Sequence, residues 1–450
     1  MPTRSVLDRA LSIFADVRAG EGFSAILLAA NVFYLLAFYS VLKIVRDALI
    51  LSEAGAVAAS YASAGQAILM LGFVPAYGAF ASRVNRVWLI CGVMLFFASN
   101  LLIFALLGVW GVRIGVPFYL WIGVFSMAAV AQFWAFANDL YNTERGKRLF
   151  PVIGVGASLG AVVGSGLTSI VFGGIGPYRL MLIAAAGLLV PVGLTVWVHR
   201  RERAQATGPR AVPASLAGGE LRRGQAASGK DVAAAEQPLS RTGGFQLVAS
   251  NRYLRLIAML VLVFSLVNTL GGFILNSMIT AEAGGDRALI GAMAGRIQTW
   301  VNFVSFLMQA FVVSRIFKYV GVRAALFILP AIALGGYTLI ALIPLFAVVQ
   351  WTKILENSVD YSIQNTTRHA LFLPTSREAK YKAKQAIDSF FVRAGDMLQA
   401  AVVFVGTMLA FSIPGFALVN VVLVVVWIVL AVAIAREHRA LVPADVDKAA

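Results

Sequence analysis

The segment from Trp351 to Leu373 carries a series of polar side chains in a chain that is 60% hydrophobic and only 13% charged. Five of these residues recur at intervals of 4, 3, 4 and 4, which places them on one face of an α-helix: Lys353, Asn357, Asp360, Gln364 and Arg368. Such a face cannot meet lipid, so it must line a water-filled cavity or pair with polar groups of neighbouring helices. We expect all of them except Lys353 to contact a bound solute.

A second group of charges lies at the end of the first apolar stretch. Tyr39, Lys43 and Arg46 occur at i, i+4 and i+7, and Asp47 follows directly. Cationic side chains bind carboxylates and phosphates through strong charge-assisted hydrogen bonds. Lys43 and Arg46 are therefore expected to attract an anionic substrate together with Arg368, and Asp47 is a candidate for gating or coupling.

Carboxylates at the same depth need a role of their own. Asp360 and Glu356 would pair with the cations while the site is empty, or would carry a coupling proton. The alternative for Lys43, Arg46 and Lys353 is structural, because such side chains also form gating ion pairs or extend to the membrane surface.

The elements that must hold these residues are membrane-spanning helices. About 20 apolar residues cross a bilayer core, and backbone groups in lipid must pair within the helix. Intervals of 18 residues or more without any charge are 22–42, 54–82, 87–112, 114–138, 149–178, 180–198, 256–281, 297–314, 324–352 and 397–435. The last interval is divided into two spans at Ser412–Gly415. The polar segment 350–373 completes the set of twelve and is the tenth span in chain order. We expect an all-α integral membrane protein.

The chain divides into two halves around residues 200–250, which are rich in Ala, Gly, Pro, Arg and Gln. Such a segment cannot bury enough apolar surface to fold alone and is expected to be a disordered basic linker. The predicted parts are an N-terminal segment 1–21, six-helix halves 22–199 and 251–436, this linker, and a tail 437–450.

Two six-helix halves with a long basic central loop are the layout of the major facilitator fold. Spans 1, 4, 7 and 10 line the central cavity in that arrangement. The fourth span ends in Asn138, a substrate-site candidate, and Asp139, a candidate for gating or coupling.

The basic residues indicate the orientation in the membrane. Of the 37 Lys and Arg residues, 28 fall in the two terminal segments and in alternate loops on one side, ten of them between Arg200 and Arg255. This asymmetry predicts that both termini and the linker are cytoplasmic in a cell (inner) membrane. The linker could also contact anionic lipid head groups. Nucleic-acid binding is not expected, because no basic cluster lies on a soluble domain.

The tenth and eleventh spans contain a distinctive set of residues: Tyr361-Ser362, Asn365, Arg368, Pro374, the run Glu378-Ala379-Lys380-Tyr381-Lys382-Ala383-Lys384, Ala386-Ile387-Asp388 and Arg393-Ala394-Gly395. This set resembles the ATP:ADP antiporter family of nucleotide transporters. Leu42-Lys43-x-x-Arg46-Asp47 is similar to the family's Leu-Arg-x-x-Lys-Asp, and residues 134–150 also fit.

The resemblance implies a secondary transporter of an anionic solute that works by alternating access, with nucleotide exchange as the leading candidate. It implies substrate contacts for Asn138 and Asn268 and gating or coupling roles for Asp388 and Arg393. The seventh span keeps Asn268 but lacks the acidic residue and the lysine that the family's nucleotide carriers have there, since the chain reads Thr269 to Leu275 instead.

Two other classes of function remain open. A membrane enzyme acting on lipid-linked substrates would need clustered histidines or carboxylates, whereas His199, His369 and His438 are far apart and no metal-ligand spacing occurs. A non-transporting scaffold or sensor with a carrier fold is the other alternative. No cofactor, metal or ATPase phosphate loop is expected.

Overall fold

The computed structural model describes residues 21–81, 84, 86–141, 143–207, 243–376 and 378–441. Within these ranges the backbone alone is described for Arg86, Asp139, 143–147 and 202–207. Every regular element in the described part of the chain is a helix. The predicted segment 1–20, the linker core 208–242 and the end of the tail, 442–450, lie outside the described residues.

Six spans form the N-terminal half. They are α2 (Gly22–Glu53), α3 (Gly55–Ala81), α4 (Arg86–Val109), α5 (Gly115–Leu140), α6 (Thr143–Ile175) and the consecutive pair α7 (Pro177–Gly187) and α8 (Leu189–Thr207).

Six further spans form the C-terminal half, and several of them are interrupted by short π-helical segments. They are α12 (Arg252–Glu282); α13 (Arg287–Leu307), η1 (Met308–Val312) and α14 (Val313–Tyr319); α15 (Val322–Ala325) and α16 (Ile328–Leu342); α17 (Phe346–Val359), η2 (Asp360–Gln364) and α18 (Asn365–Ala370); η3 (Ala379–Ala383), α19 (Lys384–Ala386), η4 (Ile387–Phe391) and α20 (Val392–Met408); and α21 (Ile413–Leu441).

The predicted twelve-helix architecture is confirmed, and so is the exceptional character of its tenth member. In the described region, 11 helical segments are long and apolar enough to cross a membrane. The composite span α17–η2–α18 is not among them, because its charged residues lower its hydropathy. It is nevertheless helical throughout and packs against α12, α13 and α16.

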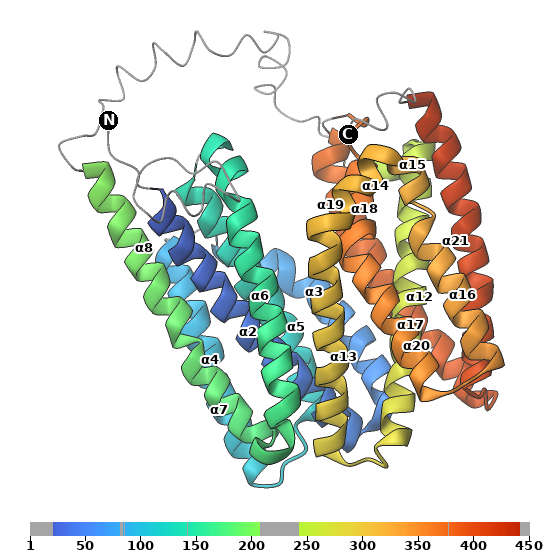
Figure 1. Ribbon diagram of the computed structural model, residues 1–450, viewed down its shortest axis with the longest axis horizontal. Helices are drawn as coiled ribbons and strands as arrows, with labels where there is room; N and C mark the ends of the chain where they lie inside the picture. The colour runs from blue at the N-terminus through green and yellow to red at the C-terminus, as the bar shows by residue number, and fades with distance from the viewer. Residues whose placement is uncertain are drawn as a thin grey trace.

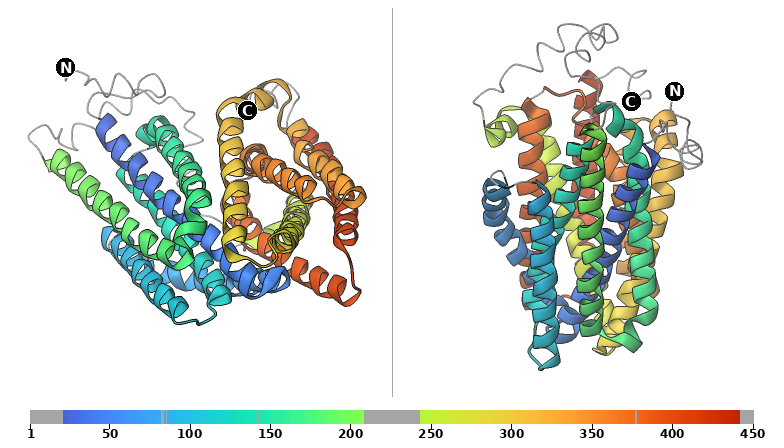
Figure 2. Two further views of the ribbon diagram at one scale, coloured as in Figure 1. Left: turned by 60° about the horizontal axis from the view of Figure 1, so that its bottom comes forward. Right: turned by 90° about the vertical axis from the view of Figure 1, so that its left-hand side faces the viewer.

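The two halves lie side by side, and helices of both run in the same general direction (Figures 1 and 2). The start of α2 and the end of α21 lie at one end of the bundle, which we call the terminal end; the opposite end is the far end. The ribbons of the halves diverge toward the terminal end and converge toward the far end (Figure 1). Contacts between the halves join α13 to α2 and α6, and join α3 to α12 and α20.

Close packing of α2 on α6 builds the wall of the N-terminal half that faces its partner half. A side chain at Gly156, Gly160 or Gly164 would overlap the backbone of α2 at Ala29, Phe33 and Ala37, respectively. Small residues at this spacing let two membrane helices approach backbone to backbone. The glycine series of α6 therefore fixes the position of α2, the helix that carries Lys43 and Arg46.

The boundaries of the predicted linker need correction at both ends. The structure extends α8 to Thr207 and places a short helix, α11 (Gly244–Ser250), before the seventh span. Val248 of α11 is buried, and the Phe245 and Phe390 rings pack edge to face with their centroids 5.3 Å apart. These apolar contacts explain why 244–250 is ordered although the composition of the surrounding segment favours disorder.

Candidate functional site

The polar face of the tenth span is largely turned toward its own half of the molecule. Lys353 and Glu356 are each only 1% exposed, and Lys353 Nζ lies 2.8 Å from Glu356 Oε2. Lys353 also donates to the backbone oxygen and the side-chain Oδ1 of Asn268 on α12, at 3.2 and 3.0 Å. Of the two alternatives left by the sequence, these residues follow the second: they pair with polar groups of neighbouring helices.

The same contacts continue into a chain of five side chains, which we call the buried polar chain: Tyr337, Glu356, Lys353, Asn268 and Asp360. Tyr337 of α16 donates to Glu356 Oε2 at 2.7 Å. Asn268 Nδ2 donates to Asp360 Oδ2 at 3.3 Å. Burying an ionised group is costly unless it is paired and hydrogen-bonded, and Lys353 and Glu356 have such partners.

A glycine makes room for this chain. A Cβ at Gly271 of α12 would overlap the Tyr337 hydroxyl and lie 3.0 Å from Lys353 Nζ. Gly271 thus leaves space beside Asn268. The Tyr337 hydroxyl of α16 and the Lys353 ammonium of α17 occupy it.

The remaining residues of the polar face differ in their environment. Gln364 is fully buried, and neither amide atom has a hydrogen-bond partner in the described part of the chain. The Arg368 guanidinium lies 5.8 Å from the Phe264 ring centroid, and its buried Nε likewise lacks a partner there. Asp360 interacts electrostatically with Arg368, and Asn357 is half-buried.

The charged residues of α2 lie at the boundary between the halves. Lys43 Nζ donates to Gln298 Oε1 of α13 at 3.3 Å, so this bond crosses from one half to the other. Arg46 stacks on Tyr119 of α5, 4.6 Å from the ring centroid, and pairs with Asp47 at 2.6 Å. Arg46 is thus already neutralised, whereas no ion pair involves Lys43 among the described residues.

Two cavities lie between the halves. The first, of about 290 Å³, we call the α2–η2 pocket; it is lined by Leu36, Ala157, Ser158, Ala161, Asn302, Ser305, Phe306, Gln309, Tyr361 and Asn365. The second, of about 230 Å³, we call the α3–α12 pocket; it is lined by Ala59, Ser60, Ser63, Tyr119, Asn268, Thr269, Gly272, Phe273, Asn276 and Gln399. Both are walled by residues of both halves.

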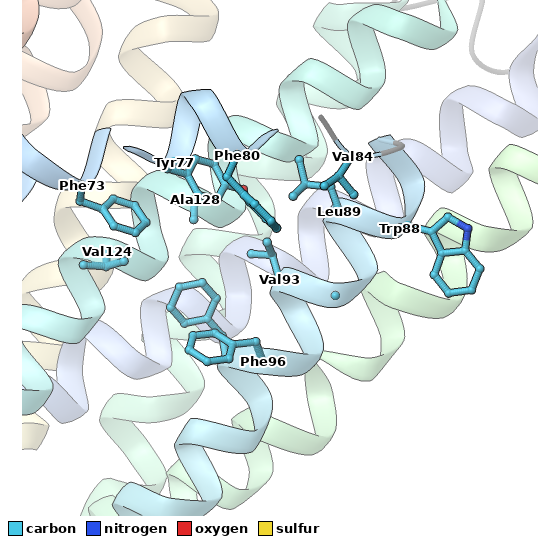
Figure 3. A pocket seen from close by; sticks show the side chains of 12 residues that line it. Phe73, Tyr77, Phe80, Val84, Trp88, Leu89, Val93, Phe96, Val124 and Ala128 are labelled. Atoms are coloured by element: carbon cyan, nitrogen blue, oxygen red, sulfur yellow. The ribbon is translucent and has the colours of Figure 1, made fainter. Parts of the chain in front are cut away.

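A third cavity, of about 340 Å³, lies within the N-terminal half between α3, α4 and α5 (Figure 3). Its lining is almost wholly apolar, including Phe73, Phe96 and Val124, and Trp88 is 77% exposed. It offers no cation for an anionic solute, so we do not regard it as the functional site.

The predicted gating and coupling residues are dispersed. Asp388 pairs with Lys384 at 2.6 Å within the eleventh span, and Arg393 pairs with Asp396 at 3.2 Å. Asn138, a predicted substrate-site residue, is exposed near the terminal end of α5, and the side chain of Asp139 is outside the described region. Asn138, Asp388 and Arg393 form no hydrogen bond or ion pair with Lys43 or Asp360 in the described part of the chain.

A polar cluster at the far end joins the halves, and no pattern in the sequence indicates it. Arg287 at the start of α13 donates to Ser52 Oγ at 2.9 Å and to the Tyr178 hydroxyl at 2.8 Å, and it pairs with Glu53 at 3.2 Å. Glu53 also accepts a bond from the Gly115 backbone nitrogen. Arg287, Ser52, Glu53 and Tyr178 are hereafter the far-end clasp.

The described residues contain no group of three or more His, Cys, Asp or Glu side chains arranged to hold a metal ion. Cys91 is buried and unpaired.

Comparison with known proteins agrees with this architecture. The sequence model described as TLC ATP/ADP transporter matches residues 103–343 and 332–438. The ADP,ATP carrier protein 1 of Chlamydia pneumoniae is 21% identical over 68% of this chain and 63% of its own length. The chloroplastic ADP,ATP carrier protein 1 of Arabidopsis thaliana is 22% identical over 70% of this chain and 53% of its own length. The chain thus matches less than two thirds of the length of these relatives.

Solved transporter structures share the fold. The nucleoside transporter NupG superposes with a TM-score of 0.61 at 14% identity, covering 92% of this chain and 99% of that one. A bacterial homologue of the iron transporter ferroportin gives a TM-score of 0.59 at 11% identity, covering 92% and 98%. At such identities the likeness concerns the two-half helical architecture.

Proposed function

The chain belongs to the TLC ATP/ADP transporter family, and on that premise we propose that it is a membrane carrier that exchanges nucleotides of the ATP/ADP type by alternating access. Its named relatives are ADP,ATP carrier proteins, and its fold is that of solved transporters. Carrier activity then replaces both alternatives, the membrane enzyme and the scaffold or sensor.

The observation that carries the proposal is a pair of cations, one in each half, that form no ion pair in the described part of the chain. Neither Lys43 of α2 nor Arg368 of α18 has a carboxylate within ion-pair distance in the described part of the chain, whereas Arg46 and Lys353 do. A cation inside a membrane-spanning bundle is costly unless an anion compensates it. A bound phosphate group would supply that compensation at Lys43 and Arg368.

Coupling would reside in the carboxylate next to these cations. Asp360 interacts electrostatically with Arg368 and accepts from Asn268 at the exposed end of the buried polar chain. While the site is empty, Asp360 would offset the charge of Arg368. When a phosphate binds, Asp360 would either release Arg368 or take up a proton. Glu356 is held by Lys353 and Tyr337, so it would support Asp360 by fixing the chain.

Orientation and location follow from the basic residues. The terminal end carries Arg200, Arg315 and Arg436 among many others, so it would face the cytoplasm of a cell-membrane carrier. The far-end clasp would then close the outer side. Contact of the predicted linker 200–250 with anionic lipid stays a prediction.

Counterflow in proteoliposomes tests the proposal. Vesicles that contain the purified protein and unlabelled ADP should accumulate labelled ATP. Lys43→Gln and Arg368→Gln should each reduce the initial rate about 10-fold or more, since a hydrogen bond to a charged group contributes about 1.5–3 kcal/mol.

Arg113→Ala is the matched control, because this arginine is exposed in the loop between α4 and α5. It should leave counterflow unchanged. If wild-type vesicles neither bind nor exchange any nucleotide, the chain is not a nucleotide carrier. If they exchange nucleotides and both glutamine variants retain the full rate, the two cations are not the phosphate ligands.

A further inference from the structure

The α2–η2 pocket is lined by polar and aromatic side chains, none of which is charged. Its lining contains amides, hydroxyls and two aromatic rings, but no acidic or basic residue. Its volume of about 290 Å³ is near the lower limit for pockets that hold small organic ligands. A pocket of this kind suits an uncharged, planar group with several hydrogen-bonding atoms.

Two of its amides are available to a ligand. Gln309 of η1 and Asn365 of α18 are exposed to the pocket side of their helices, and neither side chain is hydrogen-bonded within the described part of the chain. A carboxamide offers both donors and acceptors, as needed to bind the edge of a nucleobase. Tyr361, which is 48% exposed, provides an aromatic face on which a base could stack.

The rest of the lining is a fixed frame. Asn302 Nδ2 donates to the Ala161 backbone oxygen of α6 at 3.1 Å, and Asn302 Oδ1 accepts from Gln298 at 2.9 Å. The wall contributed by α6 consists of the small residues Ala157, Ser158 and Ala161. These contacts engage Asn302 and leave Gln309 and Asn365 without hydrogen bonds in the described part of the chain.

The cation Lys43 lies at the edge of this frame. It is bonded to Gln298, which is bonded in turn to Asn302 of the lining. Lys43 also lies near Tyr361 of the lining. An anionic group held by Lys43 would therefore be adjacent to whatever occupies the pocket.

The α3–α12 pocket does not offer the same chemistry. Gln399 donates to Ser60 at 3.0 Å, Asn268 belongs to the buried polar chain, and Thr269 donates to the Ser265 backbone oxygen. These polar groups are thus already engaged in hydrogen bonds within or between helices.

We propose that the α2–η2 pocket binds the nucleoside moiety of the substrate, with Gln309 and Asn365 reading the base and Lys43 holding the phosphates at the pocket edge. This inference rests on the proposed nucleotide exchange and deepens it: the neutral pocket would recognise the nucleoside, and the cationic edge would bind the phosphates. Mutations in the pocket and at Lys43 should therefore have different effects on binding.

Tripolyphosphate separates the two parts, since it has the phosphate chain of ATP without the nucleoside. Inhibition of labelled ADP uptake by ATP and by tripolyphosphate should be measured for the wild type, Asn365→Leu and Lys43→Gln. Asn365→Leu should raise the inhibition constant for ATP about 5- to 10-fold, the effect of one lost hydrogen bond, and leave that for tripolyphosphate unchanged. Lys43→Gln should raise both.

Asn100→Leu on α4 is the matched control, because this amide lies outside the pocket and donates to its own helix at the Phe96 oxygen. Gln309→Leu repeats the test if Asn365→Leu does not fold, as judged by gel filtration. Equal weakening of both inhibitors, or no weakening of ATP, overturns the nucleoside pocket while nucleotide exchange stands. A wild-type protein that exchanges no nucleotide overturns both.

Discussion

At the scale of single residues, the charges inside this protein fall into two groups. Lys353 and Glu356 are almost completely buried and bonded to each other, so their charges are compensated within the fold. Lys43 and Arg368 lack such compensation in the described part of the chain. The first group serves the structure of the C-terminal half, and we propose that the second binds the substrate.

The buried pair gives a prediction at this scale. Lys353→Met leaves Glu356 as an unpaired buried charge and should lower the free energy of unfolding by about 3–5 kcal/mol. In Lys353→Met/Glu356→Gln both charges are gone, and the introduced amide can still accept the Tyr337 hydrogen bond, so the double variant should be more stable than Lys353→Met. Unfolding by SDS in mixed micelles measures both. A double variant as unstable as Lys353→Met would contradict the charge-pair explanation.

At the scale of elements, two features position the site. The glycines of α6 bring α2 into backbone contact, and π-helical segments interrupt the spans that face α2 and α6 from the other half. η1 and η2 pack against each other, and both contribute to the α2–η2 pocket. π-helical turns inside α-helices occur frequently at functional sites.

The α2–α6 contact is tested by Gly160→Ala, whose new methyl group would overlap the Phe33 carbonyl of α2. Overpacking of this kind costs about 1–3 kcal/mol, so the melting temperature in detergent should fall. Gly154→Ala on the same helix is the control, since a Cβ there meets nothing within 4 Å. Alanine favours a helix over glycine by about 0.5–1 kcal/mol, so this control should melt at the wild-type temperature or slightly above it. Equal melting of both variants would show that α2 and α6 can separate without cost.

At the scale of the whole molecule, alternating access requires that contacts between the halves break and re-form. The far-end clasp is the main polar contact of that kind at its end, because Arg287 of one half binds Ser52, Glu53 and Tyr178 of the other. Lys43–Gln298 and Ser60–Gln399 are further bonds between the halves. The conformation described is thus one in which the far end is closed.

Removal of the clasp by Arg287→Ala should shift the equilibrium toward a state with the far end open, about 10-fold for the loss of hydrogen bonds to a charged group. Spin labels at Val112 and Leu342, which are 47% and 74% exposed at the far end of the two halves, report this shift in a Cys91→Ala background. Pulsed electron resonance should show a longer-distance population in Arg287→Ala but not in Arg113→Ala. Identical distance distributions in all three proteins would exclude a gating role for Arg287.

The sequence by itself determined the twelve helices, the division into halves and the family resemblance. Uninterrupted apolar length and the placement of Lys and Arg are local properties, and lipid leaves helices as the only structure for such segments. It also located the polar face of the tenth span, since residue spacing fixes which side chains share one side of a helix.

Only the tertiary structure decided where that face points. Spacing orders side chains around a helix but does not state its rotation relative to its neighbours, and the π-helical segment η2 changes that rotation midway. Lys353 and Gln364 of the predicted face consequently lie buried, whereas Tyr361 and Asn365, which are not members of that face, line the pocket between the halves. The far-end clasp was equally inaccessible from sequence, because Glu53 and Arg287 meet only when the two halves pack together.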